Sequence, residues 1–324
     1  NLASLEGAEH GIAFSSGVAG IDAIVKSLRP GDHVVATDDL YGGTYRLLRE
    51  VFEPLNIQTS FVDMSDPDAV TDAFTEDTAL LWVETPTNPL MRLVDIEALA
   101  ERAHAHDITV AVDNTFATPY LQQPLAHGAD LVLHSATKYL GGHSDLILGA
   151  VCTNSDEWAE KLRFQIKSTG AAPGPMDCFL TLRGTKTLHL RMEQHCSSAR
   201  RLAQMLNAHD KVGHVRYPGL PSHPGHALAQ KQMSDYGGMI SFELADDEMD
   251  KALAVLDAAE VFTLAESLGG VESLIEHPAS MTHASIPAEE REKIGLTDSL
   301  IRLSVGVESF EDLRDDLDRA LSRV

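Results

Sequence analysis

The sequence predicts an α/β protein in which a mostly parallel sheet is covered by helices and followed by a smaller α+β domain. Two patterns lead to this prediction. Over the first 150 residues, short runs of apolar and β-branched residues alternate with helical stretches, as in βαβ units. Further on, a long helical pattern leads into alternating strand and helix patterns. A chain of 324 residues can form two domains, and we expect a large domain over residues 1–192 and a C-terminal domain over residues 193–324.

Buried parallel strands read as short, nearly continuous apolar runs. In the first domain we expect strands at residues 33–37, 59–63, 79–84, 109–113 and 131–134. Further along we expect helices at residues 176–195, 199–208, 247–259 and 310–321, and strands at 236–244 and 299–305. Ligands of parallel sheets bind at the carboxyl ends of the strands. Polar residues follow three of the strands, and we expect residues 84–88, 113–115 and 135–138 to meet in one pocket.

Composition excludes several classes of protein. The chain has 49 acidic and 25 basic residues and a net charge of -24, which argues against a nucleic-acid-binding protein. No apolar run approaches the roughly 20 residues that cross a bilayer, so we expect no membrane partner. Three widely spaced cysteines favour a reducing compartment, and we expect a cytoplasmic protein. Histidine pairs such as His104 and His106 lack further ligands at metal spacing, so we expect no metal.

Lys138 stands in the strongest local motif of the chain, directly after the apolar run 131–134. A lysine in a non-helical segment at a strand end can condense with an aldehyde cofactor. Ser135 and Thr137, three residues and one residue earlier, can supply hydroxyls to a phosphate. The alternative is an exposed lysine in a turn. The combination of spacing and context favours the cofactor lysine.

Asp113 ends an apolar strand and is followed within two residues by Thr115. A buried carboxylate needs a cationic partner, and a protonated pyridine nitrogen is such a partner. The alternative is a hydrogen-bonded cap of the strand. Gly17 and Val18 precede another helical run, where backbone N–H groups can approach a phosphate closely, although such glycines also serve as simple helix caps.

Tyr41 and Arg46 flank two glycines, which let a ligand come close to the backbone. A phenol and a guanidinium therefore lie beside a place where a ligand can bind. Tyr41 can stack on a cofactor ring and act as an acid on a leaving group, and Arg46 can bind a remote carboxylate. Loop packing and a surface ion pair are the alternatives. Near the other end, Glu266 and Ser267 precede Arg302, whose guanidinium can grip an α-carboxylate or form a structural salt bridge.

These motifs together resemble the Cys/Met-metabolism family of pyridoxal-phosphate enzymes, over essentially the whole chain. Within that family, six segments look like those of the cystathionine γ-lyase and γ-synthase branch: residues 41–46, 84–88, 170–182, 217–223, 265–270 and 281–285. The resemblance implies a fold type I, aminotransferase-like fold with a sheet of the seven-stranded type and pyridoxal 5'-phosphate as cofactor. It also implies a homotetramer assembled as a dimer of dimers.

The resemblance implies a role for each matching residue. Lys138 would carry the cofactor, Asp113 would pair with its ring nitrogen, and Tyr41 would stack on its ring. The other implied contacts are Gly17, Val18, Thr115, Ser135 and Thr137 around the cofactor and its phosphate, Asn88 on the ring hydroxyl, and Arg46, Glu266, Ser267 and Arg302 on the substrate. Glu266 resembles the acidic residue of γ-acting members, where β-acting members carry an apolar or aromatic residue.

The expected reaction is γ-elimination of cystathionine to cysteine, 2-oxobutanoate and ammonia. The alternative is the γ-synthase reaction, in which cysteine replaces the acyl group of an O-acylhomoserine. The family normally has an N-terminal arm with a tyrosine and an arginine, and these residues begin without it. Either the arm is disordered and precedes these residues, or this form binds the cofactor poorly, and in the second case a pyridoxal-phosphate-binding protein without turnover is a more distant alternative. A nucleotide-dependent oxidoreductase is disfavoured because no Gly-x-Gly-x-x-Gly turn follows the first strand.

Overall fold

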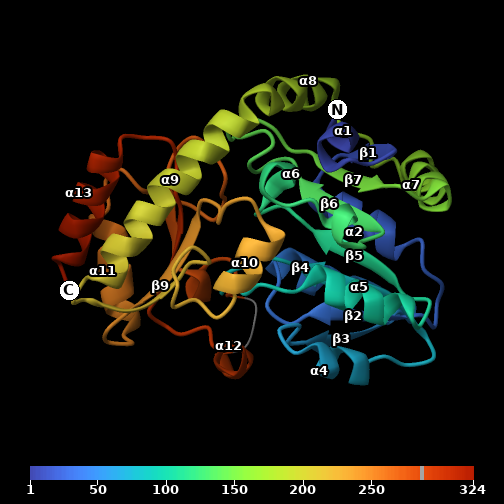
Figure 1. The fold of residues 1–324 in the computed structure, drawn as a ribbon, viewed down its shortest axis with the longest axis horizontal. Coiled ribbons are helices and arrows are strands. Elements are labelled where there is room, and N and C mark those ends of the chain that lie inside the picture. The colour runs from blue at the N-terminus through green and yellow to red at the C-terminus, as the bar shows by residue number, and fades with distance from the viewer. Residues whose placement is uncertain (285–287) are drawn as a thin grey trace.

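The chain forms two β-sheets that are linked by one long helix, α9 (Leu188–Asn207), which runs diagonally across the view in Figure 1. The computed structural model describes residues 1–284 and 288–324. Ser285, the last residue of the segment 281–285, therefore lies outside the described residues.

The first sheet has seven strands in the order β1-β7-β6-β5-β4-β2-β3. The strands are β1 (His10–Phe14), β2 (His33–Thr37), β3 (Gln58–Val62), β4 (Thr78–Glu84), β5 (Thr109–Asp113), β6 (Leu131–Ser135) and β7 (Gly149–Thr153). Strand β7 pairs antiparallel with β1 and β6, whereas β6, β5, β4, β2 and β3 pair in parallel. The predicted, mostly parallel sheet is confirmed.

Helices cover both faces of this sheet because its strands are apolar on both sides. Ile24 of α2 (Gly17–Val25) and Leu162 of α7 (Asp156–Thr169) are buried in a core with Leu133 on one face. Leu99 of α5 (Ile96–His104) is buried in another core with Val110 on the opposite face. The other helices of this part are α1 (Leu2–Glu6), α3 (Gly42–Arg46), α4 (Pro67–Asp72), α6 (Thr118–Leu121) and α8 (Pro175–Gly184).

The second sheet has the order β10-β11-β12-β9-β8. Its strands are β8 (Val212–Arg216), β9 (Met239–Leu244), β10 (Thr263–Leu264), β11 (Leu274–Glu276) and β12 (Leu300–Ser304), and its helices are α10 (His226–Gln232), α11 (Met249–Ala258), α12 (Ala288–Ile294) and α13 (Phe310–Leu321). Helix α9 belongs to two cores: Met192 packs with Tyr139 of the first part, and Leu202 packs with Phe242 of the second. The predicted boundary at residue 192 thus falls inside a continuous helix.

Two sequence predictions differ from the structure. The helix predicted at residues 176–195 is interrupted, because α8 ends at Gly184 and a 3-10 turn over Thr185–Thr187 precedes α9. Gly184 lies so close to the backbone that a Cβ there would be 2.3 Å from the carbonyl oxygen of Gly141. Strands β1, β7, β8, β10 and β11 were not predicted; each is only two to five residues long and lacks a distinctive pattern of its own.

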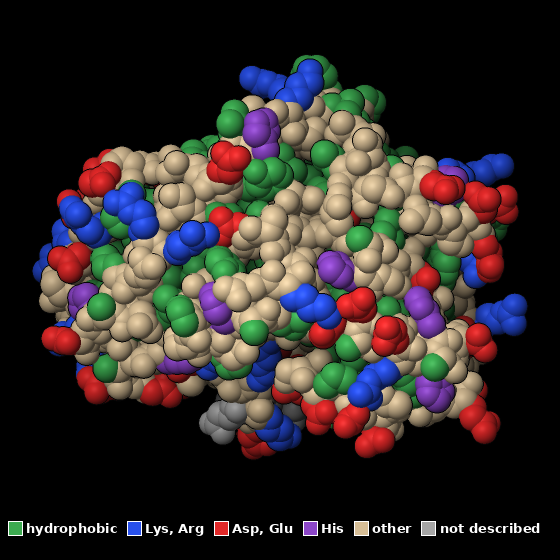
Figure 2. All heavy atoms as spheres, viewed as in Figure 1, with side chains coloured by type: hydrophobic (Ala, Val, Ile, Leu, Met, Phe, Trp, Pro, Cys, Tyr) green, Lys and Arg blue, Asp and Glu red, His purple; other side chains and the backbone are tan. Residues whose placement is uncertain are grey.

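Acidic side chains are scattered around the surface in Figure 2, in keeping with the net charge of -24. Within the described ranges, the structure has no helix that is both long enough and apolar enough to span a membrane. Those ranges also contain no cluster of His, Cys, Asp or Glu side chains arranged to hold a metal ion.

Candidate active site

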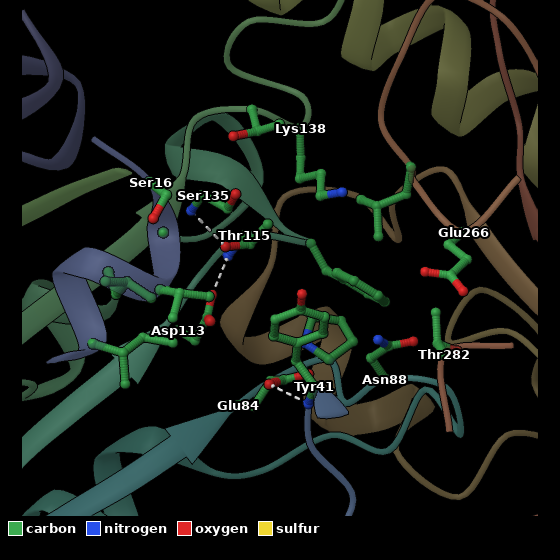
Figure 3. Close-up of a pocket in the computed structure, with 18 of the residues that line it drawn as sticks. Ser16, Tyr41, Glu84, Asn88, Asp113, Thr115, Ser135, Lys138, Glu266 and Thr282 are labelled. Atoms are coloured by element: carbon green, nitrogen blue, oxygen red, sulfur yellow. Dashed lines mark hydrogen bonds between the residues drawn. The ribbon is translucent and has the colours of Figure 1, made fainter. Parts of the chain in front are cut away.

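A cavity of about 220 Å³ lies where the carboxyl ends of β4, β5 and β6 face the start of α2 and the loops of the second sheet. Figure 3 shows it with Asp113, Thr115 and Ser135 on one side and Glu266 on the other. The polar strand ends predicted to converge do so. The lining residues are Ser16, Gly17, Val18, Ile21, Tyr41, Glu84, Pro86, Asn88, Asp113, Thr115, Phe116, Leu133, Ser135, Thr137, Lys138, Ile147, Glu266, Leu268, Thr282 and Arg302.

Lys138 follows β6 and points its amine into this cavity (Figure 3). Its Nζ donates a hydrogen bond of 2.9 Å to Oγ of Ser267. Burial, and secondly the nearby positive charge of Arg302, lower the pKa of Lys138 to about 8, against the opposing effect of Glu276 and Glu266. A substantial fraction of the amine is therefore neutral near pH 8, and a neutral amine is nucleophilic.

Asp113 is the last residue of β5, and its carboxyl group is held at the edge of the cavity by the following turn. The backbone N–H of Thr115 donates to Oδ1 of Asp113 at 3.0 Å, and the N–H of Ser135 donates to Oγ1 of Thr115 at 2.9 Å. Burial raises the pKa of Asp113, although the hydrogen bonds from Thr115 and the proximity of His134 oppose the rise. Among the described residues no cation forms an ion pair with this carboxyl, so a cationic ligand would stabilise its charged form.

The start of α2 forms a cradle of backbone N–H groups beside β6. Ser16 caps the helix by accepting a 3.0 Å hydrogen bond from the N–H of Ala19, and Gly17 and Val18 are the first helical residues. A Cβ at Gly17 would lie 2.9 Å from Cβ of Ser135, so only glycine fits this close approach. A helix of nine residues whose first N–H groups face a cavity attracts a phosphate.

Thr137 completes this side of the cavity. Its hydroxyl accepts a hydrogen bond from the backbone N–H of Leu148 at 3.2 Å, which fixes the segment between β6 and Lys138. Together with Ser135, it places a second hydroxyl beside the start of α2.

Arg302, in the middle of β12, is 1 % exposed and is held by four oxygen atoms. One terminal nitrogen donates to Oδ1 of Asn88 at 2.7 Å and lies 3.0 Å from Oε1 of Glu276. The other terminal nitrogen donates to the carbonyl oxygens of Glu266 and Ser267 at 2.9 and 3.1 Å. The buried Nε has no hydrogen-bond partner within the described part of the chain, so one donor stays free for a ligand.

The structural salt bridge considered for Arg302 is therefore present, and its partner Glu276 was missed. Glu276 lies directly opposite Arg302 in the antiparallel pairing of β11 with β12. Burial raises the pKa of Glu276 to about 7, while Arg302 lowers it. Because β11 is only three residues long, no periodic pattern in the sequence indicated this pairing.

Tyr41 and Arg46 occupy different environments. Tyr41 lines the cavity, and its ring lies over Gly43, where a Cβ would come within 2.3 Å of the ring. Arg46 is an exposed residue at the end of α3 and does not line the cavity, so its contact with a remote substrate carboxylate stays a prediction. Ser267 also lies outside the lining but reaches the cavity through Lys138.

Glu84 belongs to the segment 84–88 that was predicted to reach the pocket, and it lines the cavity, whereas Phe116 and Thr282 were missed as lining residues. Glu84 ends β4, and its Oε2 accepts a 3.0 Å hydrogen bond from the backbone N–H of Tyr41. Its position at the end of an apolar strand, equivalent to that of Asp113 on β5, is the pattern that led to this prediction.

The groups present fit pyridoxal 5'-phosphate. Lys138 offers an amine of lowered pKa, Asp113 offers a carboxyl that lacks a cationic partner among the described residues, and the start of α2 offers a phosphate cradle closed by Ser135. These features, on a parallel sheet with a second α+β part, define the class of pyridoxal-phosphate enzymes of fold type I.

The chain belongs to the family of Cys/Met metabolism PLP-dependent enzymes, whose sequence model matches residues 1–322. It is similar to a cystathionine beta-lyase of Lactococcus lactis subsp. cremoris (strain MG1363), with 55% identity over 99% of this chain and 84% of the relative. It is also similar to a cystathionine gamma-lyase of Dictyostelium discoideum, with 50% identity over 99% of this chain and 83% of the relative. The family establishes the cofactor as pyridoxal phosphate and the protein as a lyase-type enzyme of cysteine and methionine metabolism.

Solved structures agree with this assignment. The crystal structure of metB from Corynebacterium glutamicum matches with a TM-score of 0.96 and 47% identity, over 99% of this chain and 83% of that one. Cystathionine gamma-lyase from Lactobacillus plantarum, complexed with L-serine, matches with a TM-score of 0.97 and 44% identity, over 99% and 84%. The predicted fold type I is confirmed.

Proposed function

We propose that this enzyme cleaves cystathionine by γ-elimination, giving cysteine, 2-oxobutanoate and ammonia. The observation that carries the proposal is Glu266, a carboxylate that lines the same cavity as Lys138 and Arg302. In the family resemblance, γ-acting members carry an acidic residue at this position. An acidic side chain at the rim favours the distal ammonium group of cystathionine, because opposite charges attract in a partly desolvated site.

The chain's own residues divide the chemistry among them. The bound cofactor supplies an electron sink for the carbanion at Cα of the substrate. Arg302 binds the α-carboxylate through its free Nε, and Asp113 keeps a positive charge on the ring nitrogen. Lys138, whose amine is tied by one hydrogen bond to Ser267, would take the proton from Cα and pass it on to the bound cofactor, so that the amine, neutral again, can take one from Cβ. The carbon–sulfur bond at Cγ can then break.

Tyr41 lies in the same cavity and donates a proton to the departing sulfur. Cysteine leaves as the thiol, and hydrolysis of the remaining unsaturated amine yields 2-oxobutanoate and ammonia. Gly17, Val18, Ser135 and Thr137 hold the phosphate throughout, so that the reacting atoms keep their orientation.

The products decide this proposal. The purified protein, loaded with pyridoxal phosphate, is incubated with cystathionine, and the keto acids and thiols are separated and quantified. We expect 2-oxobutanoate and cysteine in equal amounts. Pyruvate and homocysteine instead would overturn γ-elimination, and no product of either kind would favour a binding protein without turnover.

Two other reactions compete with this proposal. β-Elimination is favoured by the relatives from Lactococcus lactis and Coxiella burnetii that are named cystathionine beta-lyase, at 55% and 54% identity. γ-Replacement, the synthase reaction, uses the same residues but lets cysteine capture the unsaturated intermediate. An O-acylated homoserine plus cysteine tests it, since cystathionine would then accumulate.

We also propose that the enzyme is a cytoplasmic homotetramer of two dimers, with its domains divided near residue 192. Three large apolar side chains on α8 support the assembly: Met176, Phe179 and Leu182 are 65%, 60% and 50% exposed. Apolar side chains gather at the top of the view in Figure 2, over this helix. An apolar patch that is exposed in a single chain is usually buried against another subunit in an oligomer. Light scattering coupled to size exclusion measures the mass of the assembly.

A further inference from the structure

Three carboxyl groups are buried together at the carboxyl ends of neighbouring strands. Glu84 ends β4, Asp113 ends β5, and Asp39 lies just beyond β2, with exposed fractions of 5%, 8% and 1%. Glu84 and Asp113 are direct partners in the parallel pairing of β4 with β5. Strand pairing therefore fixes these two carboxyls beside each other at the floor of the cavity.

Two neighbouring carboxyl groups in a low-dielectric site do not both ionise. Within residues 1–284 and 288–324, neither Glu84 nor Asp113 has an ion-pair partner that would offset a second charge. Both carboxyls accept backbone hydrogen bonds that favour their charged forms, Glu84 from Tyr41 and Asp113 from Thr115, and Asp113 in addition has His134 nearby. Glu84 faces acidic neighbours, Asp113 and Asp39, and burial together with these charges raises its pKa well above the usual range.

Glu84 also holds the backbone of Tyr41. Its Oε2 accepts the 3.0 Å hydrogen bond from the N–H of Tyr41, which is drawn as a dashed line in Figure 3. Tyr41 is the residue from which α3 begins, and its ring is 40% exposed, so packing alone holds the ring only weakly. This bond helps to fix the backbone from which the ring projects, and so contributes to where the ring lies.

We propose that Glu84 is a positioning residue that acts as the neutral acid: it anchors Tyr41 through the backbone and leaves Asp113 as the single negative charge available to the pyridine nitrogen. The site then presents one charge rather than two to the cofactor. A carbonyl oxygen of a protonated carboxyl still accepts the N–H of Tyr41, so both tasks are compatible.

Four charged or titratable groups from different segments of the chain surround Glu84. They are Asp113 on β5, Asp39 after β2, Tyr41 before α3 and Arg302 on β12. Arg302 is itself paired with Glu276, and the charges that act on the Glu84 carboxyl are those of Asp113 and Asp39. This inference concerns cofactor binding and does not depend on which carbon–sulfur bond the enzyme breaks.

The test compares two replacements of Glu84. Glu84→Gln imitates the neutral acid and keeps the acceptor for Tyr41, whereas Glu84→Leu removes the acceptor. The apoproteins are titrated with pyridoxal phosphate from pH 6 to 9, and the pH midpoint of the visible absorption of each loaded protein is recorded. Infrared spectra of the apoproteins detect the carbonyl stretch of a protonated acid. Glu101→Gln, an exposed acid on α5, is the matched control for lost surface charge.

We expect Glu84→Gln to keep the dissociation constant of the cofactor within about threefold and the pH midpoint within a few tenths of a unit. The wild-type spectrum should contain a protonated-acid band that Glu84→Gln removes and Glu101→Gln retains. Glu84→Leu should weaken cofactor binding about tenfold, because Tyr41 loses its anchor.

Two results would overturn the inference. A shift of about one pH unit in the midpoint of Glu84→Gln, with no change in the protonated-acid band, means that Glu84 carries a charge in the wild type. Cofactor binding by Glu84→Leu equal to that of the wild type means that Glu84 does not position Tyr41. If Glu84→Leu does not fold, the comparison of Glu84→Gln with the wild type still shows whether Glu84 is charged. Glu84→Asp, whose shorter side chain reaches less far toward Tyr41, then takes the place of Glu84→Leu as the test of positioning.

Discussion

Lys138 and Ser267 connect the two sheets of the protein through one hydrogen bond, in which Nζ of Lys138 donates to Oγ of Ser267 at 2.9 Å. Lys138 follows β6 in the large sheet, and Ser267 lies between β10 and β11 in the small one. The position of the amine in the cavity therefore depends on how the second sheet packs against the first.

Replacing Lys138 by alanine should abolish covalent attachment of the cofactor and lower turnover by about a thousandfold or more, because we propose Lys138 as both the point of attachment and the base. Borohydride reduction followed by mass spectrometry measures the attachment. Lys231→Ala is the control, since Lys231 lies on α10 and pairs with the surface residues Asp95 and Glu97. A cofactor adduct that survives in Lys138→Ala would refute the assignment.

The pH dependence of cofactor attachment follows from the pKa of about 8 for Lys138 in the empty protein. Only the neutral amine attacks an aldehyde, and below its pKa the neutral fraction falls about tenfold for each pH unit. The rate of attachment to apoprotein should therefore rise from pH 6 to 8 and level off above about pH 9. Stopped-flow absorbance measures this rate. A rate that keeps rising beyond pH 10 would indicate an ordinary, solvated lysine.

Asp113→Asn should still bind the cofactor but lose most of its turnover, because an amide does not keep the ring nitrogen protonated. We expect a fall in kcat of about a hundredfold or more, with a smaller change in cofactor affinity. Steady-state kinetics and apoprotein titration measure the two quantities separately. Unchanged turnover would show that Asp113 only caps its strand.

Glu276→Leu should destabilise the fold, because it leaves Arg302 buried without its charged partner. Loss of one member of a buried ion pair costs about 3 to 5 kcal/mol in the free energy of unfolding. Urea denaturation measures the loss. The control is Glu97→Ala, which breaks an exposed ion pair with Lys231 and should cost about 1 kcal/mol or less. Equal losses in both variants would mean that the Arg302 pair contributes no more than a surface pair.

Much of the large sheet was predictable from local patterns. Strands β2 and β5 occur over the predicted residues 33–37 and 109–113, and β4 and β6 differ from their predictions by one residue each. Fully buried strands need continuous apolar runs, and that requirement is visible in the sequence around any single strand. The polar residues at the strand ends were visible for the same reason, and Asp113 and Lys138, predicted on that basis, both line the cavity.

Local residue patterns indicated the α/β class, the family and the proposed lysine and carboxylate of the cofactor site. The order of the strands, and with it the pairing of Glu84 with Asp113 and of Glu276 with Arg302, came from the tertiary structure. The tertiary structure also brought Ser267 to Lys138 across 129 residues of chain. Burial and periodicity are properties of one segment, whereas these contacts depend on strand order and on the packing of two sheets, which no single segment encodes.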